Sequence, residues 1–172
     1  SAAAYRTALN CVRIGIELLP DKAWTDLYDL ALQLHREAAE VSYLCTEFPE
    51  MEDFVAVVLE KAASLEDQIP VYETKIQGDI ARARKVEALK TGLEVLEKLK
   101  VKIPFSPGLL YVGWSLVKTR LALSRRSIPE LVNLPPMTNP RVLTAMRIAT
   151  RISSTAYVVN PNLFAALVLK EV

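Results

Sequence analysis

The spacing of apolar residues constrains the fold of this chain more than any other feature. Three segments place apolar or small residues at positions i, i+3, i+7 and i+10, which line up along one face of an α-helix. The three sets are Tyr5, Ala8, Val12 and Gly15, then Phe48, Met51, Val55 and Val58, then Val86, Leu89, Leu93 and Leu96. A pattern that recurs along a chain is typical of stacked helical repeats. The sequence therefore predicts an all-α fold, with Met51 and Leu93 as core anchors.

Prolines and capping residues predict where the helices begin and end. Pro20 is expected to end the first helix, and Asp21 to cap a long second helix that runs to about Cys45. The other helices are expected to start at Pro49, Val71, Val86, Leu109, Pro140 and Pro161. Asn139 and Asn160 each precede one of these prolines, and Asn followed by Pro suits the cap and first position of a helix.

The regularity of the pattern changes near residue 100. Residues 1–100 are typical of antiparallel helix hairpins, whereas residues 101–172 hold irregular helices joined by Pro-punctuated segments. Small residues occur where the two helices of a hairpin would cross closely, at Ala39, Ser42 and Gly78. No shift of composition separates the two parts, so we expect one helical-repeat domain over 1–172.

The ends of the chain predict a fragment of a longer protein. The first stripe has no upstream partner helix, and the last helix is still apolar where the sequence stops. Repeat arrays normally end in capping repeats with a polar outer face, and neither end has one. We therefore expect self-association through the exposed apolar surface. That surface is expected to comprise Ala8, Val12 and Gly15 at one end, and Leu163, Phe164, Leu167 and Val168 at the other.

Length and composition favour a folded domain and exclude several classes of protein. Of the 172 residues, 51% are hydrophobic and 24% are charged, as in a globular protein. A net charge of +1 gives no electrostatic case for binding nucleic acid or an anionic membrane. No apolar run approaches the roughly 20 residues of a membrane span, and no signal peptide is visible. We expect a soluble, cytoplasmic protein.

No group of residues predicts catalysis, a cofactor or a metal. The chain has neither of the glycine-rich phosphate-binding motifs, GxxxxGK[ST] and GxGxxG. His35 is the only histidine, and we expect it to be packed or solvated. Cys11 and Cys45 favour buried free thiols over a disulfide. The acidic residues Glu47, Glu50, Glu52 and Asp53 cluster at a helix start, where the helix dipole explains them better than a bound cation.

Three hydroxyl residues follow basic residues in the manner of kinase substrates. These are Ser127, Thr150 and Ser154, and the pattern leaves open whether any is modified.

Two-helix units of this length are similar to tetratricopeptide repeats, which stack in a right-handed superhelix and bind partners on a concave face. The first helices of the second and third hairpins would line that face. They place six candidate partner-binding residues there, namely Gln33, Arg36, Glu40, Tyr43, Thr74 and Arg82. An ordinary solvated surface is the alternative interpretation. A second hypothesis is a groove for a small molecule, walled by Tyr111 and Trp114, although core packing also explains these two aromatics.

Several phrases resemble the helical-repeat region of large multi-domain signalling kinases found especially in cyanobacteria. The most specific are "LPDKAW", "YLCTEFPEME" and "LPPMTNP". Those kinases combine a serine/threonine kinase, an AAA- or STAND-type ATPase, this helical region, a GAF sensor and a histidine kinase. The resemblance implies a non-catalytic, regulatory scaffold whose partners are other domains of the parent kinase or a signalling protein. The alternative is a ligand-sensing helical domain that controls the neighbouring ATPase switch.

Overall fold

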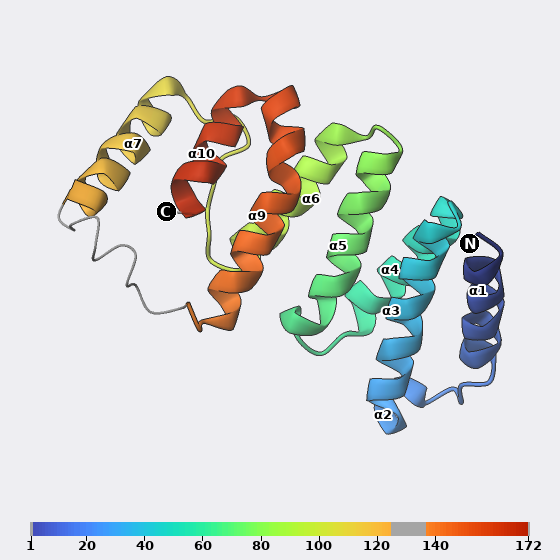
Figure 1. The fold of residues 1–172 in the computed structure, drawn as a ribbon. Helices are drawn as coiled ribbons and strands as arrows, with labels where there is room; N and C mark the ends of the chain where they lie inside the picture. Colours follow the sequence, from blue (N-terminus) through green and yellow to red (C-terminus); the bar gives the residue numbers. More distant parts are fainter. Residues whose placement is uncertain (1, 125–136, 172) are drawn as a thin grey trace. The chain divides into compact units, whose positions relative to one another are not determined.

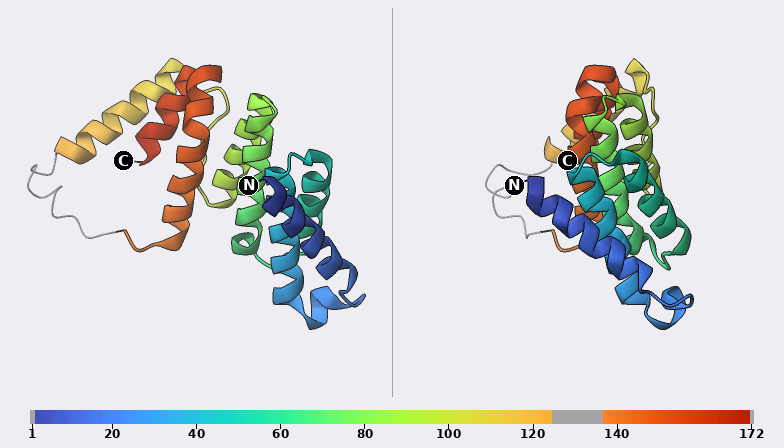
Figure 2. Two further views of the ribbon diagram at one scale, coloured as in Figure 1. Left: turned by 45° about the vertical axis from the view of Figure 1, so that its right-hand side comes forward. Right: turned by 90° about the vertical axis from the view of Figure 1, so that its right-hand side faces the viewer.

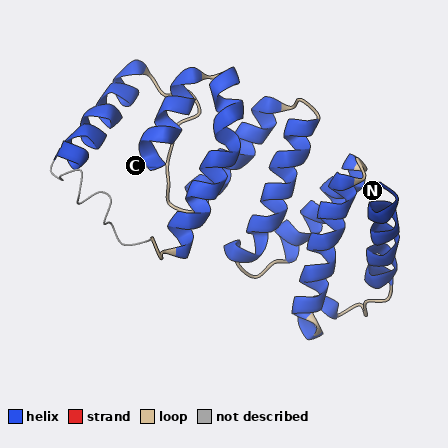
Figure 3. Cartoon of the chain, viewed as in Figure 1, coloured by secondary structure: helices blue, strands red, loops and turns tan. Residues whose placement is uncertain are grey.

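The computed structural model describes residues 2–124 and 137–171, which contain helices and no strand (Figures 1 and 3). The all-α prediction is therefore confirmed for the described chain. The helices are α1 (Ala2–Glu17), α2 (Ala23–Asp26), α3 (Tyr28–Leu44), α4 (Phe48–Lys61), α5 (Leu65–Ala81), α6 (Lys85–Lys98), α7 (Leu109–Ser124), α9 (Pro140–Val159) and α10 (Pro161–Glu171). None of the described helices combines the length and hydropathy needed to cross a membrane.

The chain divides into two compact units, unit 1 (Ser1–Ala83) and unit 2 (Arg84–Val172). In unit 1, α3 packs against α1, α2, α4 and α5, and α1 lies against α3 in both views of Figure 2. In unit 2, α9 packs against α6 and α10, and α10 also packs against α7. The sequence predicted one domain with a change of regularity near residue 100, and this stays a prediction. Helix α6, which precedes that change, lies in unit 2.

The second apolar stripe forms the core of unit 1, as predicted. Met51, Val55 and Val58 on α4 are buried in one cluster with Leu32, Ala39 and Val71. The predicted neighbours α3 and α4 pack together. Gly78 lies so close to Met51 that a Cβ atom built on it would be 2.7 Å from the sulfur. Met51 is therefore the core anchor that the spacing predicts.

The first stripe lies one residue away from the buried face of α1. Leu9 is buried, while Tyr5 is exposed and Val12 is only half-buried. Helix α3 is the main neighbour of α1, so only a narrow strip of α1 is covered. The prediction of buried thiols is wrong, because Cys11 is exposed and Cys45 is half-buried, although both are free.

Two predicted helix starts are wrong. The expected long helix from Asp21 is interrupted at Leu27, and Lys22 precedes the short α2 as its N-cap. Helix α5 begins at Leu65 and continues through Pro70, since the Ser64 hydroxyl accepts a hydrogen bond from the Asp67 amide at 3.1 Å.

The predicted asparagine caps are confirmed in unit 2. Asn139 Oδ1 accepts a hydrogen bond from the Arg141 amide at 3.0 Å, and Pro140 is the first residue of α9. Asn160 Oδ1 accepts hydrogen bonds from the Asn162 and Leu163 amides at the start of α10. Both side chains occupy backbone donors that the first turn of a helix leaves unpaired.

The core of unit 2 only partly follows the third stripe. Leu89 and Leu96 are buried, but Val86 is exposed and Leu93 is half-buried, so Leu93 is not the expected core anchor. The expected uncovered stripe on α10 is also wrong in part. Leu163 and Leu167 are fully buried, because α10 packs against both α7 and α9.

Candidate functional site

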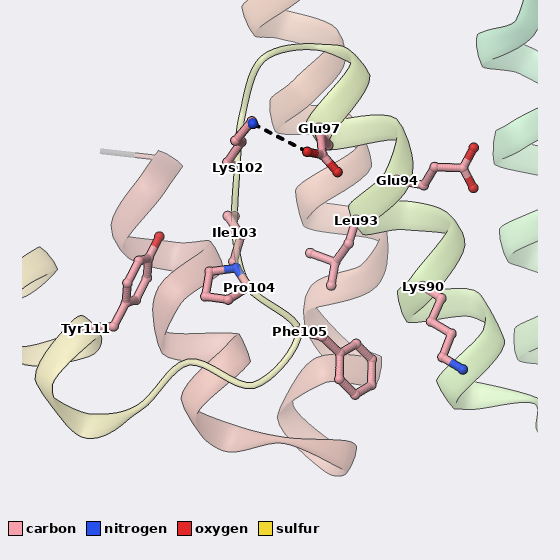
Figure 4. Close-up of a pocket in the computed structure, with 9 residues that line it drawn as sticks. All are labelled: Lys90, Leu93, Glu94, Glu97, Lys102, Ile103, Pro104, Phe105 and Tyr111. Atoms are coloured by element: carbon pink, nitrogen blue, oxygen red, sulfur yellow. Dashed lines mark ion pairs between the residues drawn. The ribbon is translucent and has the colours of Figure 1, made fainter.

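A groove of about 850 Å³ lies within unit 2, beside α6 (Figure 4). Its walls come from α6, from the segment that follows it and from the first turn of α7. The lining residues are Lys90, Leu93, Glu94, Glu97, Lys102, Ile103, Pro104, Phe105 and Tyr111. Concave sites of roughly 300–1,000 Å³ are typical of ligand binding. The groove is therefore the candidate functional site.

The end of α6 determines where the second wall of the groove runs. Lys100 adopts the left-handed conformation, with φ of 70°. Its amide donates to the Glu97 carbonyl at 2.9 Å, and the Val101 amide donates to the Leu96 carbonyl at 2.8 Å. These two bonds form a Schellman motif, which ends the helix and reverses the chain. The following segment therefore runs back beside α6, as Figure 4 shows.

A tether from α10's cap holds this segment in place. Asn160 Nδ2 donates a hydrogen bond to the Phe105 carbonyl at 3.1 Å. The same asparagine caps α10 through its Oδ1 atom, so one side chain links the helix start to the groove wall. Pro104 and Pro107 restrict the segment further, because proline fixes its own φ angle.

The groove combines an apolar floor with charges of both signs. Leu93, Pro104 and Phe105 surround the same space in Figure 4. On the rim, Lys102 Nζ lies 3.6 Å from Glu97 Oε1. The lining contains no histidine, cysteine or serine. This chemistry suits the binding of an apolar side chain flanked by polar groups.

Only one of the two aromatic residues predicted to wall a small-molecule groove lines the groove that the structure shows. Tyr111 lines the groove, whereas Trp114 lies outside it with its side chain largely exposed. The sequence analysis did not predict that the segment after α6 lines the groove. The prolines and apolar residues of that segment were a signal that could have indicated it.

The six predicted partner-binding residues all belong to unit 1, and none of them lines the groove. Gln33 and Glu40 are exposed on α3, and Tyr43 is half-buried. Thr74 is buried, and its hydroxyl donates to the Pro70 carbonyl at 3.2 Å. Thr74 therefore offers little surface to a partner.

Arg36 joins α3 to the start of α5. Its guanidinium donates to the Asp67 carbonyl at 2.6 Å and lies 3.0 Å from the Asp67 carboxylate. The Tyr28 hydroxyl donates to the same carboxylate at 2.9 Å and accepts from the Ala63 amide. Burial raises the pKa of Tyr28. Burial alone would also raise the pKa of Asp67, but hydrogen bonds from Ser64 and Tyr28 and the charge of Arg36 outweigh it and lower that pKa.

Arg82 links α5 to α4 in a similar way. Its Nη2 atom lies 2.6 Å from Glu52 and 3.0 Å from Asp79, whose carboxylate is buried. The guanidinium also lies 5.0 Å from the centre of the Phe48 ring, within reach of a cation–π interaction. Arg36 and Arg82 are thus engaged in holding unit 1 together.

The acidic cluster at the start of α4 pairs with arginines from other helices. Glu50 binds Arg13 of α1 at 2.6 Å, and Glu52 binds Arg82. Within the described ranges, no group of three or more potential ligands is placed to hold a metal ion. Ion pairs between helices, together with the helix dipole, therefore explain why these acidic residues cluster at the start of α4.

His35 is packed inside unit 1. Its Nδ1 atom lies 2.7 Å from the Ala31 carbonyl, and its ring lies 5.0 Å from Trp24 and 6.2 Å from Phe54. Of the hydroxyl residues considered for modification, Thr150 and Ser154 are exposed on α9. Ser127 lies outside the described residues.

Comparisons with protein-family models, curated proteins and solved structures find no match to the chain. The resemblance to multi-domain signalling kinases stays a prediction.

Proposed function

We propose that the chain is a non-catalytic protein-interaction and regulatory scaffold. In this proposal its helices form tetratricopeptide-like hairpins of a right-handed superhelix, within a multi-domain signal-transduction kinase. The observation that carries the proposal is the groove beside α6, which has an apolar floor and a charged rim. Its partner would be a segment of another domain of the parent kinase or of a signalling protein.

The residues of the groove suit a short peptide segment. An apolar side chain of the partner would contact Leu93, Pro104 and Phe105, where burial of apolar surface supplies affinity. Polar groups beside it would meet Lys90 and Glu94 on the rim, which would select the sequence around the anchor. A buried anchor with a polar surround is the usual anatomy of a protein interface.

Peptide selection against the purified chain tests this proposal. Peptides selected from a random displayed library are expected to bind the wild type and to bind Phe105→Ala about tenfold more weakly. Leu18→Ala, which truncates an exposed leucine after α1, is the matched control and should bind like the wild type. Peptides that bind both variants equally, or a failure to enrich any peptide, would contradict the groove as an interaction site.

The volume of the groove favours a second candidate function, a ligand-sensing helical domain that controls a neighbouring ATPase switch. Small molecules occupy sites of this size. A ligand that binds the folded chain raises its melting temperature, and the stabilisation grows with the logarithm of ligand concentration over Kd. A thermal-shift screen with small metabolites should give a stabiliser that fails on Phe105→Ala if the groove is a sensor. Stabilisation only by other domains of the parent protein would favour the scaffold.

A further inference from the structure

Helix α7 has one covered side and one exposed apolar side. The covered side faces α10, and it is formed by Tyr111, Val112, Ser115 and Thr119, all half-buried. The Thr119 hydroxyl donates to the Leu169 carbonyl at 3.4 Å, which places the covered side toward α10. The opposite side of α7 therefore faces away from α10 (α7 is labelled in Figure 1).

The exposed side carries apolar residues at a specific spacing. Leu110, Trp114, Val117 and Leu121 are 92%, 64%, 56% and 54% exposed. They follow one another at i, i+4, i+7 and i+11, the alternation of four and three that forms the seam between two paired helices. Contiguous apolar surface of this kind on a folded domain marks an interaction site. We call these four residues the α7 seam.

Basic residues border the α7 seam on both edges. Lys118, four residues after Trp114, lies on one edge, and Arg120, three residues after Val117, lies on the other. The ammonium of Lys118 lies 5.7 Å from the centre of the Trp114 ring. Helix α7 contains no aspartate or glutamate, so its own sequence supplies no opposite charge.

We propose that the α7 seam docks an amphipathic helix of a partner protein, with glutamate or aspartate flanking that helix's apolar stripe. The apolar stripe would pack along Leu110, Trp114 and Val117, and the flanking carboxylates would pair with Lys118 and Arg120. Such edge charges set the choice and orientation of the partner helix. This proposal does not depend on the groove beside α6.

The position of the charges favours an acidic helix over two other occupants. A second copy of α7 would bring no carboxylate to Lys118 or Arg120. The net charge of the chain is only +1, which gives no bulk electrostatic attraction to an anionic bilayer. A carboxylate from a partner helix would pair with the Lys118 ammonium beside the Trp114 ring.

Gly113 makes a close approach of a second helix feasible. It is exposed on α7, one residue before Trp114, and a Cβ atom built there would meet nothing within 4 Å. A glycine on a helix surface lets another backbone or a large side chain approach closely.

A pair of designed peptides tests the proposal on the whole chain. Both are helical and carry a leucine stripe at heptad spacing, but one has glutamate and the other lysine at the flanking positions. We expect the glutamate peptide to bind at least about tenfold more tightly at low salt, and this preference to weaken as salt screens the charges. Trp114→Ala should reduce its affinity about tenfold or more, since large aromatics dominate helix docking.

A charge reversal separates this mechanism from simple apolar attraction. The double variant Lys118→Glu, Arg120→Glu should reverse the preference and bind the lysine peptide more tightly. Leu18→Glu, at an exposed site in unit 1, is the control and should bind like the wild type. Circular dichroism melting curves should be unchanged, because all these positions are exposed.

Three results would overturn the proposal. The first is equal or absent binding of the two peptides to the wild-type chain. The second is binding to vesicles of phosphatidylcholine and phosphatidylserine that depends on Trp114 while neither peptide binds, which would indicate a membrane surface. The third is dimerisation in sedimentation experiments that Trp114→Ala abolishes while neither peptide binds, which would indicate a second copy.

Discussion

The two units hold their helices together in different ways. In unit 1, charged hydrogen bonds cross between helices, from Arg13 to Glu50, from Arg36 to Asp67 and from Arg82 to Glu52. In unit 2, the contact between α6 and α9 includes Gly92 against Ile152, where a residue without a side chain meets a branched apolar side chain. Unit 2 also contains the groove and the α7 seam.

This difference indicates where the chain can bind a partner. Polar side chains that are already paired, as in unit 1, would have to lose those partners before contacting another molecule. Apolar surface that is still exposed, as on α7, gains free energy when a partner covers it. We therefore expect the substitutions that affect binding to lie in unit 2, and the substitutions in unit 1 to affect stability.

Truncation of Met51 is expected to have the largest effect. Met51→Ala removes a fully buried side chain from the core of unit 1 and should lower the free energy of unfolding by about 2–5 kcal/mol. Leu93→Ala should cost much less, about 1 kcal/mol, because half-buried Leu93 has less apolar surface to lose. Chemical denaturation followed by circular dichroism measures both.

Leu96→Ala is the matched control for that comparison. Leu96 lies on the same helix as Leu93 but is buried, so its truncation should cost about as much as that of Met51. If Leu93→Ala destabilises the chain as much as Leu96→Ala, the half-buried position of Leu93 in the groove is wrong.

Two glycines provide the next comparison. A Cβ atom on Gly92 would lie 2.6 Å from Ile152 Cγ2, and one on Gly78 would lie 2.7 Å from Met51 Sδ. The β-branched isoleucine is stiff, whereas the thioether is flexible and can move aside. Gly92→Ala should therefore cost about 1–3 kcal/mol, while Gly78→Ala should stay within about 1 kcal/mol of the wild type, helped by alanine's higher helix propensity.

Thermal unfolding of the two alanine variants checks this prediction. Gly113→Ala is the control, because the added methyl group would meet nothing. It should report the gain in helix propensity alone. Equal destabilisation at Gly78 and Gly92 would show that the rigidity of the neighbour does not decide the cost.

Local signals in the sequence predicted much of the fold. The start of α9 follows from Asn139 and Pro140, and the start of α10 from Asn160 and Pro161, because capping acts within a few residues. The start of α5 was missed because Pro70 resembles a helix breaker, while the Ser64 cap lies in an unremarkable stretch. Inside a helix, proline removes one backbone hydrogen bond and its ring clashes with the preceding turn, which is why Pro70 predicted a break.

The candidate site could not be predicted in the same way. Its walls meet because of the Schellman turn at Lys100 and the bond from Asn160 to the Phe105 carbonyl. No local sequence pattern predicts that Lys100 adopts the left-handed conformation, because glycine is the residue that usually does so. The sequence also placed Arg36 and Arg82 on a binding face. Their ion-pair partners on other helices, such as Asp67 for Arg36, lie about 30 residues away in the sequence, so no local pattern predicts these pairs.

Acidification should weaken unit 1 through Asp67. Its pKa in the folded chain lies below the ordinary value of 3.8, so the ionised form stabilises the fold. That contribution is present above pH 3.8 and is lost as the pH falls through the lower, folded pKa. Asp67→Asn should cost about 1–2 kcal/mol at pH 7, and the difference from the wild type should shrink as the pH falls below 4. Urea denaturation across this pH range measures the change, and a pH-independent difference would contradict it.

The smallest expected effect concerns the Arg13–Glu50 pair. Glu50 raises the pKa of Arg13 through their hydrogen bond, and Nε and Nη2 of the guanidinium bind the two carboxylate oxygens at 2.7 and 2.6 Å. The pair is partly exposed, so its coupling should be about 0.5–1 kcal/mol and should fall in 1 M salt. The Lys98–Glu94 pair of unit 2 lies within one helix, where coupling of about 0.3–0.5 kcal/mol is usual.

Double-mutant cycles with glutamine at both positions of each pair measure the two couplings. The larger coupling should belong to Arg13–Glu50, because two bonds in a fixed plane join α1 to α4, whereas Lys98–Glu94 joins neighbouring turns of α6. Equal couplings, or a larger value for Lys98–Glu94, would mean that a two-bond charge pair between helices is no stronger than a pair within one helix.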